Sequence, residues 1–192
     1  SYAHDYLGRF GFDPNRHPKN LTMSLGTGTV TPLQMAGAYA VFANGGYAVQ
    51  PYLVAKIEDA RGNVLAQAAR PATPPESQRV IDARNAFVMN SLLQEITRSG
   101  TAARAQATLK RTDLFGKTGT TNDAVDAWFV GYQPSLVAAA WVGYDTPRNL
   151  GSRETGGGLS LPIWISFIFF VNDTATTEIY TPPSGVINVG GE

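Results

Sequence analysis

The sequence predicts an α+β fold, in which helices pack against a separate antiparallel sheet. Two stretches, 32–43 and 82–99, carry apolar residues at helical spacing. Three extended stretches, 113–121, 126–131 and 136–144, follow one another with short connections. Successive strands joined in this way are typical of an antiparallel meander. Helices that are segregated from such a sheet along the chain characterise the α+β class.

The first long helix has a strong start signal. Residues 1–30 are rich in turn residues and predict only a short helix that ends near Phe10. Thr31 then suits the N-cap, Pro32 the first helical position, and Gln34 completes a capping box. An Asn-Gly-Gly sequence at 44–46 ends this helix.

A hairpin and a second helix follow. The stretches 52–57 and 64–66 flank an Arg-Gly-Asn turn and predict a β-hairpin. Residues 70–75 hold three prolines and predict a loop. Asp82 caps the second predicted helix, and Gly100 ends it. Its predicted apolar face consists of Phe87, Val88, Leu92, Leu93 and Ile96.

The third strand and the region after it complete the predicted fold. The stretch 137–143 is apolar on both faces, which predicts a central strand covered on both sides. The aromatic residues Trp128, Phe129 and Trp141 are expected in the core of the sheet. Gly156 to Gly158 predict a flexible loop, and a helix is expected to start at Leu161 with Pro162 at its first position.

Composition excludes several classes of protein. Lys+Arg and Asp+Glu are 15 each, so the net charge of zero argues against a nucleic-acid-binding protein. The chain contains no cysteine, which excludes disulfides and thiolate sites. The two histidines, His4 and His17, are expected at the surface. No set of residues has metal-ligand spacing, so we expect no metal and no cofactor.

Targeting signals are not visible within these residues. The first residues are polar and do not resemble a signal peptide. The most apolar run, 163–171, is shorter than the roughly 20 residues that a membrane span needs, so it predicts a buried helix or strand.

The segment 115–122, Phe-Gly-Lys-Thr-Gly-Thr-Thr-Asn, carries the chemistry. On an edge strand, Thr118 and Thr120 point to the same face, where two hydroxyls can bind one carboxylate. Lys117 adds a compact positive charge. Gly119 lets another backbone lie close to the strand, and the backbone N–H of Thr120 is free to act as an oxyanion-hole donor. The strand is therefore suited to a peptide that ends in a carboxylate.

The same segment has two other interpretations. A phosphate-binding loop needs a glycine five residues before the Gly-Lys pair, but Arg111 occupies that position. A Lys-Thr-Gly-Thr sequence by itself is also common in polar turns. The tetrapeptide alone therefore leaves a plain surface turn open.

Separated motifs in a consistent order favour the functional interpretation. These motifs are Val-Thr-Pro-Leu-Gln-Met-Ala at 30–36, Phe-Ala-Asn-Gly-Gly at 42–46, Gly-Thr-Ala at 100–102, Gly-Lys-Thr-Gly-Thr-Thr-Asn at 116–122, Asp-Ala-Trp-Phe-Val-Gly-Tyr at 126–132, Trp-Val-Gly-Tyr-Asp at 141–145, Gly-Gly-Gly at 156–158 and Pro-Ile-Trp at 162–164. In these motifs the chain resembles class A high-molecular-weight penicillin-binding proteins, and the resemblance extends to about Phe167.

The resemblance implies a serine-type D-Ala-D-Ala transpeptidase with a β-lactamase/transpeptidase-like fold. It implies that Lys117 and Thr120 are catalytic and that Lys117, Thr118, Gly119 and Thr120 bind substrate. The implied partners are peptidoglycan stem peptides and β-lactam antibiotics. The implied parent chain is membrane-anchored, carries a glycosyltransferase domain and works at the periplasmic face of the bacterial inner membrane.

Two departures from the family pattern stand out. No serine in the chain has a lysine three residues later, and no Ser-x-Asn occurs. We therefore expect residues 1–192 to be the C-terminal portion of an incomplete transpeptidase domain, which is inactive alone because the nucleophile lies elsewhere. The decapeptide 172–181 resembles translated sequencing-adapter read-through, so its origin as genuine protein sequence is left open.

Two alternative functions remain at this point. A serine β-lactamase-like hydrolase would share the Lys-Thr-Gly strand but would need a base that activates water. A non-catalytic module that binds β-lactams or peptidoglycan would share both the fold and the carboxylate-binding strand.

Overall fold

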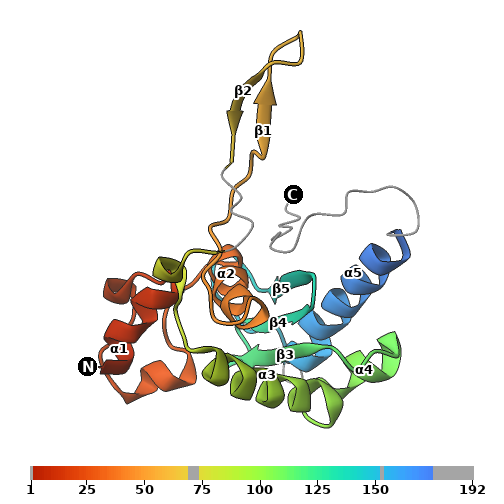
Figure 1. Ribbon diagram of the computed structural model, residues 1–192. Helices are drawn as coiled ribbons and strands as arrows, with labels where there is room; N and C mark the ends of the chain where they lie inside the picture. The colour runs from red at the N-terminus through yellow and green to blue at the C-terminus, as the bar shows by residue number, and fades with distance from the viewer. Residues whose placement is uncertain (1, 69–73, 152–153, 175–192) are drawn as a thin grey trace.

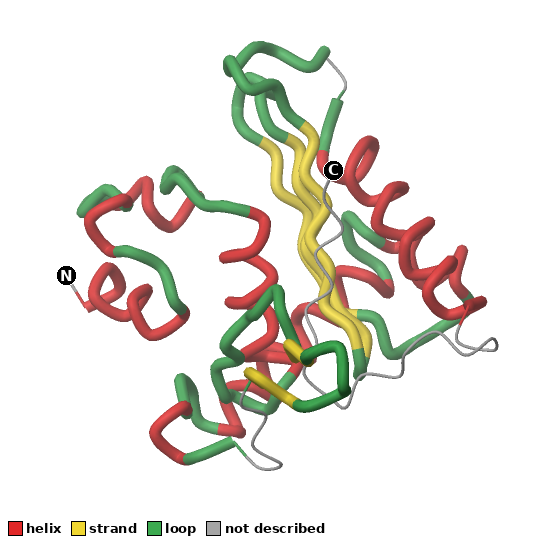
Figure 2. The backbone as a smooth tube through the Cα atoms, turned by 90° about the horizontal axis from the view of Figure 1, so that it is seen from above, coloured by secondary structure: helices red, strands yellow, loops and turns green. Residues whose placement is uncertain are grey.

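The computed structural model describes residues 2–68, 74–151 and 154–174. A three-stranded antiparallel sheet lies between two helical layers (Figures 1 and 2). Helix α2, Pro32–Ala43, packs on one face of the sheet, and α5, Leu161–Thr174, packs on the other. The predicted α+β class is therefore confirmed.

The N-terminal region consists of short helical turns. Helix α1, Tyr2–Leu7, continues into the 3₁₀ turn η1, Gly8–Phe10, and so confirms the short helix. The turns η2, Pro14–Arg16, and η3, Leu21–Leu25, follow. The expectation of a surface position is wrong for His4, which is only 2% exposed. Its Nε2 lies 2.7 Å from the Pro14 carbonyl oxygen, so a partner from η2 compensates for burial of the polar ring.

Helix α2 begins with the predicted capping box. The Thr31 hydroxyl accepts from the Gln34 N–H at 3.2 Å, and the Gln34 side chain accepts from the Thr31 N–H at 2.9 Å. These two hydrogen bonds satisfy backbone donors that the first turn of a helix leaves unpaired. The helix then buries Ala36 and Ala40 against the sheet.

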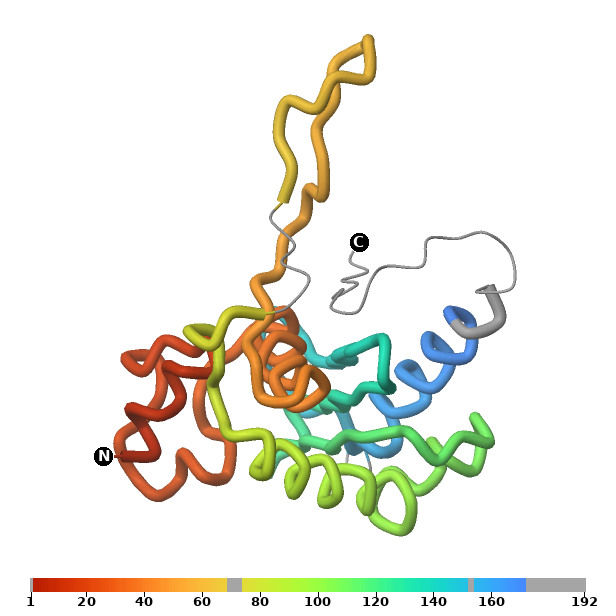
Figure 3. The backbone as a smooth tube through the Cα atoms, in the orientation of Figure 1, coloured from red at the N-terminus to blue at the C-terminus, as the bar shows by residue number. Residues whose placement is uncertain are grey.

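The predicted hairpin projects away from the rest of the molecule (Figures 1 and 3). It pairs β1, Lys56–Glu58, with β2, Val64–Gln67, around a turn at Gly62 with a φ of 83°. The first strand is shorter than expected, because 52–55 are not in the strand. Every residue of both strands is exposed, so no packed face extends the pairing.

Helix α3, Ala83–Arg98, has the predicted Asp82 N-cap, and its predicted buried face is only partly confirmed. Phe87 is 72% exposed, and Val88 and Leu92 are also exposed. Leu93 is buried as predicted and Ile96 is partly buried, whereas the other buried positions are Ala86 and Thr97. Apolar spacing marks possible core faces, but the side that packs is decided by which neighbour the helix meets.

Helix α3 is flanked by two short helical elements. The turn η4, Glu76–Gln78, precedes it. Helix α4, Ala103–Leu109, follows it and buries Ala105 completely. This second element brings the chain back toward the sheet.

The sheet has the order β3-β4-β5, with β3 at Phe115–Thr120, β4 at Ala127–Gln133 and β5 at Leu136–Val142. Both pairs are antiparallel, which confirms the meander. The central position predicted for 137–143 is wrong among the described residues, because β4 is the middle strand. Helices cover both faces of β5, and covered faces make a strand apolar whether or not both its edges are paired.

The predicted positions of the aromatic residues are only partly confirmed. Phe129 is fully buried, whereas Trp141 is 39% exposed. The Trp141 Nε1–H donates to Asp126 Oδ1 at 2.8 Å, which holds the indole at the rim of the sheet.

The segment after the sheet is more regular than predicted. Gly156–Ser160 form a π-helical turn, η5, rather than a flexible loop. This turn leads directly into α5, so Pro162 is the second residue of that helix. Trp164 of α5 is fully buried and packs edge-on against Phe129 with ring centroids 5.0 Å apart.

The apolar run 163–171 lies in α5, so the helix is confirmed, but Ile163, Phe169 and Phe170 are exposed and the predicted burial is confirmed only in part. None of the helices in the described ranges is long and apolar enough to cross a membrane. The predictions for 70–73 and 175–181 lie outside the described residues.

Candidate active site

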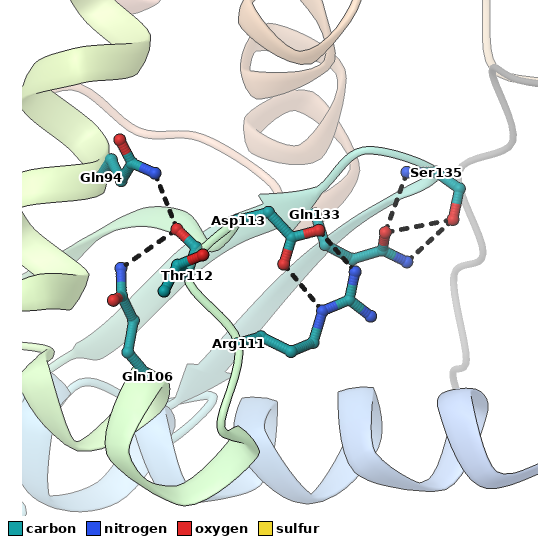
Figure 4. Close-up of polar contacts among 7 residues, drawn as sticks. All are labelled: Gln94, Gln106, Arg111, Thr112, Asp113, Gln133 and Ser135. Carbon is teal, nitrogen blue, oxygen red and sulfur yellow. Dashed lines mark hydrogen bonds and ion pairs between the residues drawn. The ribbon is translucent and has the colours of Figure 1, made fainter.

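Strand β3 is held in place by polar contacts from α3 and α4. Thr97 is fully buried and donates to the Leu114 carbonyl at 2.5 Å. The side-chain amide of Gln106 donates to the Thr97 hydroxyl at 3.0 Å. The side-chain amide of Gln94 donates to the Thr112 carbonyl at 2.7 Å (Figure 4). These hydrogen bonds fix the chain just before β3 and therefore fix the position of the Lys-Thr-Gly residues.

An ion pair lies in the segment directly before β3. Arg111 donates two hydrogen bonds to Asp113, at 2.8 and 2.7 Å (Figure 4). The hydrogen bonds from Arg111 hold the pKa of the Asp113 carboxyl below its usual range. A lowered pKa stabilises the fold above the ordinary carboxyl pKa, and this contribution is lost as the pH falls through the lowered value.

One edge of β3 is open among the described residues. Gly119 pairs with Trp128 and Thr120 with Ala127, and the Thr121 N–H donates to the Asp126 carbonyl. Antiparallel pairs alternate between hydrogen-bonded and non-hydrogen-bonded positions, so the N–H and C=O of Thr120 point away from β4. The backbone donor predicted for an oxyanion hole therefore faces the open edge.

Alternation places the side chains of β3 on two faces. Phe115 stacks on Tyr132 at 4.9 Å on the α2 face, and Lys117 shares this face. Burial raises the pKa of Tyr132, and its hydroxyl donates to Asn90 Oδ1 at 2.5 Å. Thr118 and Thr120 lie on the opposite face, where α4, η5 and α5 pack.

The ammonium of Lys117 lies at the open edge. It is exposed and donates to the Thr118 carbonyl at 2.8 Å, and it lies 3.5 Å from the Thr118 hydroxyl. Within the described part of the chain, no carboxylate forms an ion pair with it. Its positive charge is therefore available to an anionic ligand.

The two threonine hydroxyls are already oriented by neighbours. Thr120 Oγ1 accepts from the Gly156 N–H at 3.0 Å, so its own proton is left to be donated. Thr118 Oγ1 lies 2.8 Å from Thr101 Oγ1. Both hydroxyls lie on one face of the strand, as the alternation predicted.

Gly119 is approached by backbone, and the approaching segment is η5. A Cβ on Gly156 would lie 2.2 Å from the Trp128 carbonyl oxygen and 2.5 Å from that of Gly119. Only glycine at 156 lets η5 lie this close to the sheet, and this contact brings the Gly156 N–H to Thr120.

Sequence reasoning gave no role to Thr101 or Gly156. Both belong to motifs that carried only the family resemblance, and nothing in their local sequence signals contact with β3. Their roles depend on how α4 and η5 pack, which local patterns do not specify.

The chemistry of these side chains does not suit a metal ion. Over the residues that the structure describes, no group of three or more His, Cys, Asp or Glu side chains is placed to hold a metal ion. The groups that this site offers are hydroxyls, backbone N–H groups and one ammonium. These groups favour an anionic ligand with a neighbouring carbonyl.

Comparisons with known proteins identify the family. Residues 6–164 match the model of the penicillin binding protein transpeptidase domain. The chain is 44% identical over its whole length to penicillin-binding protein 1A of Neisseria flavescens and spans 24% of that relative.

Two solved structures are also similar. The crystal structure of penicillin-binding protein 1A from Haemophilus influenzae superposes with a TM-score of 0.78, at 30% identity over 95% of this chain and 32% of that one. The PonA1 protein from Mycobacterium tuberculosis, in complex with penicillin V, gives 0.65 at 28% identity over 90% of this chain and 45% of that one.

These matches confirm both the resemblance and the β-lactamase/transpeptidase-like fold predicted from the motifs. The chain spans about a quarter of the length of the curated relative. A family model that covers residues 6–164 decides the assignment, and the chain therefore belongs to the penicillin-binding protein transpeptidase domain family.

Proposed function

We propose that this chain is the carboxylate-binding half of a D,D-transpeptidase active site. One observation carries the proposal: Thr118 and Thr120 present hydroxyls on the same face of an open-edged strand, and the Lys117 ammonium at that edge lies 3.5 Å from the Thr118 hydroxyl. In this proposal, the two hydroxyls bind the terminal carboxylate of a D-Ala-D-Ala stem peptide. Gly119 gives the peptide backbone room along the edge.

The reaction then follows the geometry of the edge. A serine from outside these 192 residues attacks the penultimate D-Ala carbonyl, and the Thr120 N–H stabilises the oxyanion that forms. Collapse of the intermediate breaks the peptide bond to the terminal D-Ala and leaves an acyl-enzyme. The amine of the released D-Ala takes up the proton that the serine hydroxyl lost. An amine of a second stem peptide attacks this ester, and the serine regains its proton as the cross-link forms. Lys117 supplies positive charge near the reacting groups and requires no cofactor.

The same site would accept β-lactam antibiotics, because their carboxylate and carbonyl occupy comparable positions. The complete protein in this proposal is anchored in the bacterial inner membrane, and its transpeptidase domain faces the periplasm. A glycosyltransferase domain elsewhere in that protein would build the glycan strands that this domain cross-links.

Replacing Thr120 with valine tests the carboxylate contact in the complete parent protein. Valine keeps the shape and removes one hydroxyl, so binding of the carboxylate should weaken by about 1.5–3 kcal/mol, as is typical of hydrogen bonds to charged groups. The measurement is the second-order acylation rate constant with benzylpenicillin. Thr112→Val is the matched control, since Thr112 is exposed and precedes β3. Equal rate constants for the Thr120 and Thr112 variants would contradict the contact.

The isolated chain should form no covalent penicillin adduct. It contains no Ser-x-x-Lys sequence, and without an activated serine there is no acyl-enzyme. Intact-mass spectrometry after incubation with labelled penicillin measures this directly. The complete parent protein is the positive control. A stoichiometric adduct on the isolated chain would show that a nucleophile lies within it.

A further inference from the structure

The Thr101 hydroxyl lies against β3, beside one of the two threonines proposed to bind the carboxylate. Thr101 lies between α3 and α4, 17 positions before Thr118, and the two Oγ1 atoms are 2.8 Å apart. The side chains of Thr101 and Lys117 are both exposed, and Lys117 lies at the open edge of β3. The pair therefore lies where a ligand of β3 would dock, not in the core.

The backbone around Thr101 is closely packed. Ala102 is fully buried, and its N–H donates to the Ile96 carbonyl at 3.1 Å. A Cβ on Gly100 would lie 2.9 Å from the Ile96 Cα, so the turn closes tightly against the end of α3. A Cβ on Gly157 would lie 3.3 Å from the Thr101 carbonyl oxygen, so η5 bounds the turn on another side. This packing allows Thr101 to set the direction of a neighbouring hydroxyl.

The direction of the Thr118 hydroxyl proton depends on which of the two threonines donates to the other. A hydroxyl has one donor and two lone pairs, so the hydrogen bond between the two threonines can run in either direction. If Thr118 donates to Thr101, its lone pairs face an incoming carboxylate, and the partial negative charge of the hydroxyl oxygen repels the anion. If Thr101 donates to Thr118, the Thr118 proton is free to point at the carboxylate. The second arrangement forms a chain of donors that ends on the anion, and each bond polarises the next.

We propose that Thr101 is a positioning residue that donates to Thr118 and so directs the Thr118 hydroxyl proton to the carboxylate of the substrate. This inference rests on the proposed function, because it deepens the role of the same site. Thr118 and Thr120 are then oriented by analogous means. Thr120 accepts from the Gly156 N–H, and Thr118 accepts from the Thr101 hydroxyl. In both cases the accepted bond leaves the threonine proton for the ligand.

The test compares two probes on the complete parent protein: benzylpenicillin and its methyl ester, which lacks the negative charge. For the wild type, the ratio of the two acylation rate constants measures recognition of the carboxylate. Thr101→Val should lower the rate constant for benzylpenicillin about tenfold, which is the change that about 1.4 kcal/mol produces. The rate constant for the ester should change by less than about twofold, because a neutral acceptor gains little from the directed proton.

Two further variants separate positioning from general structural damage. Thr101→Ser keeps the hydroxyl and should restore the wild-type ratio. Thr22→Val removes a comparable hydroxyl pair outside the site, since Thr22 Oγ1 lies 3.2 Å from Thr27 Oγ1, and it should leave the ratio unchanged.

Each remaining outcome overturns a stated claim. An unchanged ratio in Thr101→Val, with the wild type acylated, would overturn the role of Thr101 alone. An equal fall for both probes would overturn it too, since a merely structural residue would act in that way. A wild-type parent that benzylpenicillin does not acylate would overturn the proposed function and this inference with it.

Discussion

Acylation by benzylpenicillin should fall about 10²–10⁴-fold when Lys117 of the complete parent protein is replaced by alanine, the range typical of a lost acid–base or electrostatic contribution. The Lys117 side chain is exposed, and its described hydrogen bonds reach only Thr118 of its own strand. Removing it therefore takes a positive charge from the open edge without opening a cavity. The thermal unfolding midpoint should stay that of the wild type.

A matched control for this variant exists on the hairpin. Lys56 is also exposed and pairs with Glu58 at 2.7 Å, far along the chain from β3. Lys56→Ala should acylate at the wild-type rate. Lys117→Arg adds information, because a planar guanidinium keeps the charge but not the compact donor geometry. If Lys117→Ala is acylated as fast as the wild type, Lys117 has no place in the mechanism.

Trp164→Ala should destabilise the transpeptidase domain by about 3–5 kcal/mol, the usual cost of deleting a buried large aromatic side chain. Trp164 is only 1% exposed, and its Nε1–H lies 3.3 and 3.2 Å from the carbonyls of Gly131 and Ala138. The substitution removes the contact with Phe129. It also leaves the carbonyls of Gly131 in β4 and Ala138 in β5 without the donor that they share. The hole would lie directly behind the sheet that carries β3.

Thermal unfolding of the complete parent protein measures this loss as a lower midpoint for the transition of the transpeptidase domain. Phe169→Ala is the control, because Phe169 belongs to the same helix and is 60% exposed. The midpoint of Trp164→Phe should fall between those of Trp164→Ala and Phe169→Ala, since phenylalanine keeps part of the packing and loses the donor. A midpoint for Trp164→Ala as high as that of Phe169→Ala would contradict the assigned role of Trp164 in the core.

The local elements were predictable because their signals are local. The capping box at Thr31 depends on residues only three positions apart, and the structure forms both of its hydrogen bonds. The meander follows from short connections and alternating patterns, and the structure pairs the three strands in that order. The common face of Thr118 and Thr120 follows from the period of a strand.

The features that sequence reasoning missed depend on contacts between distant segments. The apolar spacing of α3 predicts that Phe87 is buried, yet it is 72% exposed because the helix turns Ala86, Leu93 and Thr97 inward. Three consecutive glycines predict a flexible loop, yet the close approach of Gly156 to Gly119 requires a glycine in an ordered turn. The contact between Thr101 and Thr118 likewise appears only once α4 is packed.

The most direct test of the account is a crystal structure of the benzylpenicillin acyl-enzyme of the complete parent protein. The account predicts an ester bond to a serine outside these 192 residues. It predicts that the penicillin carboxylate lies within hydrogen-bond distance of the Thr118 and Thr120 hydroxyls, and that the ester carbonyl oxygen accepts from the Thr120 N–H. A carboxylate bound away from both hydroxyls, or an ester on a serine within this chain, would contradict the central claim that β3 holds the substrate for a nucleophile supplied from elsewhere.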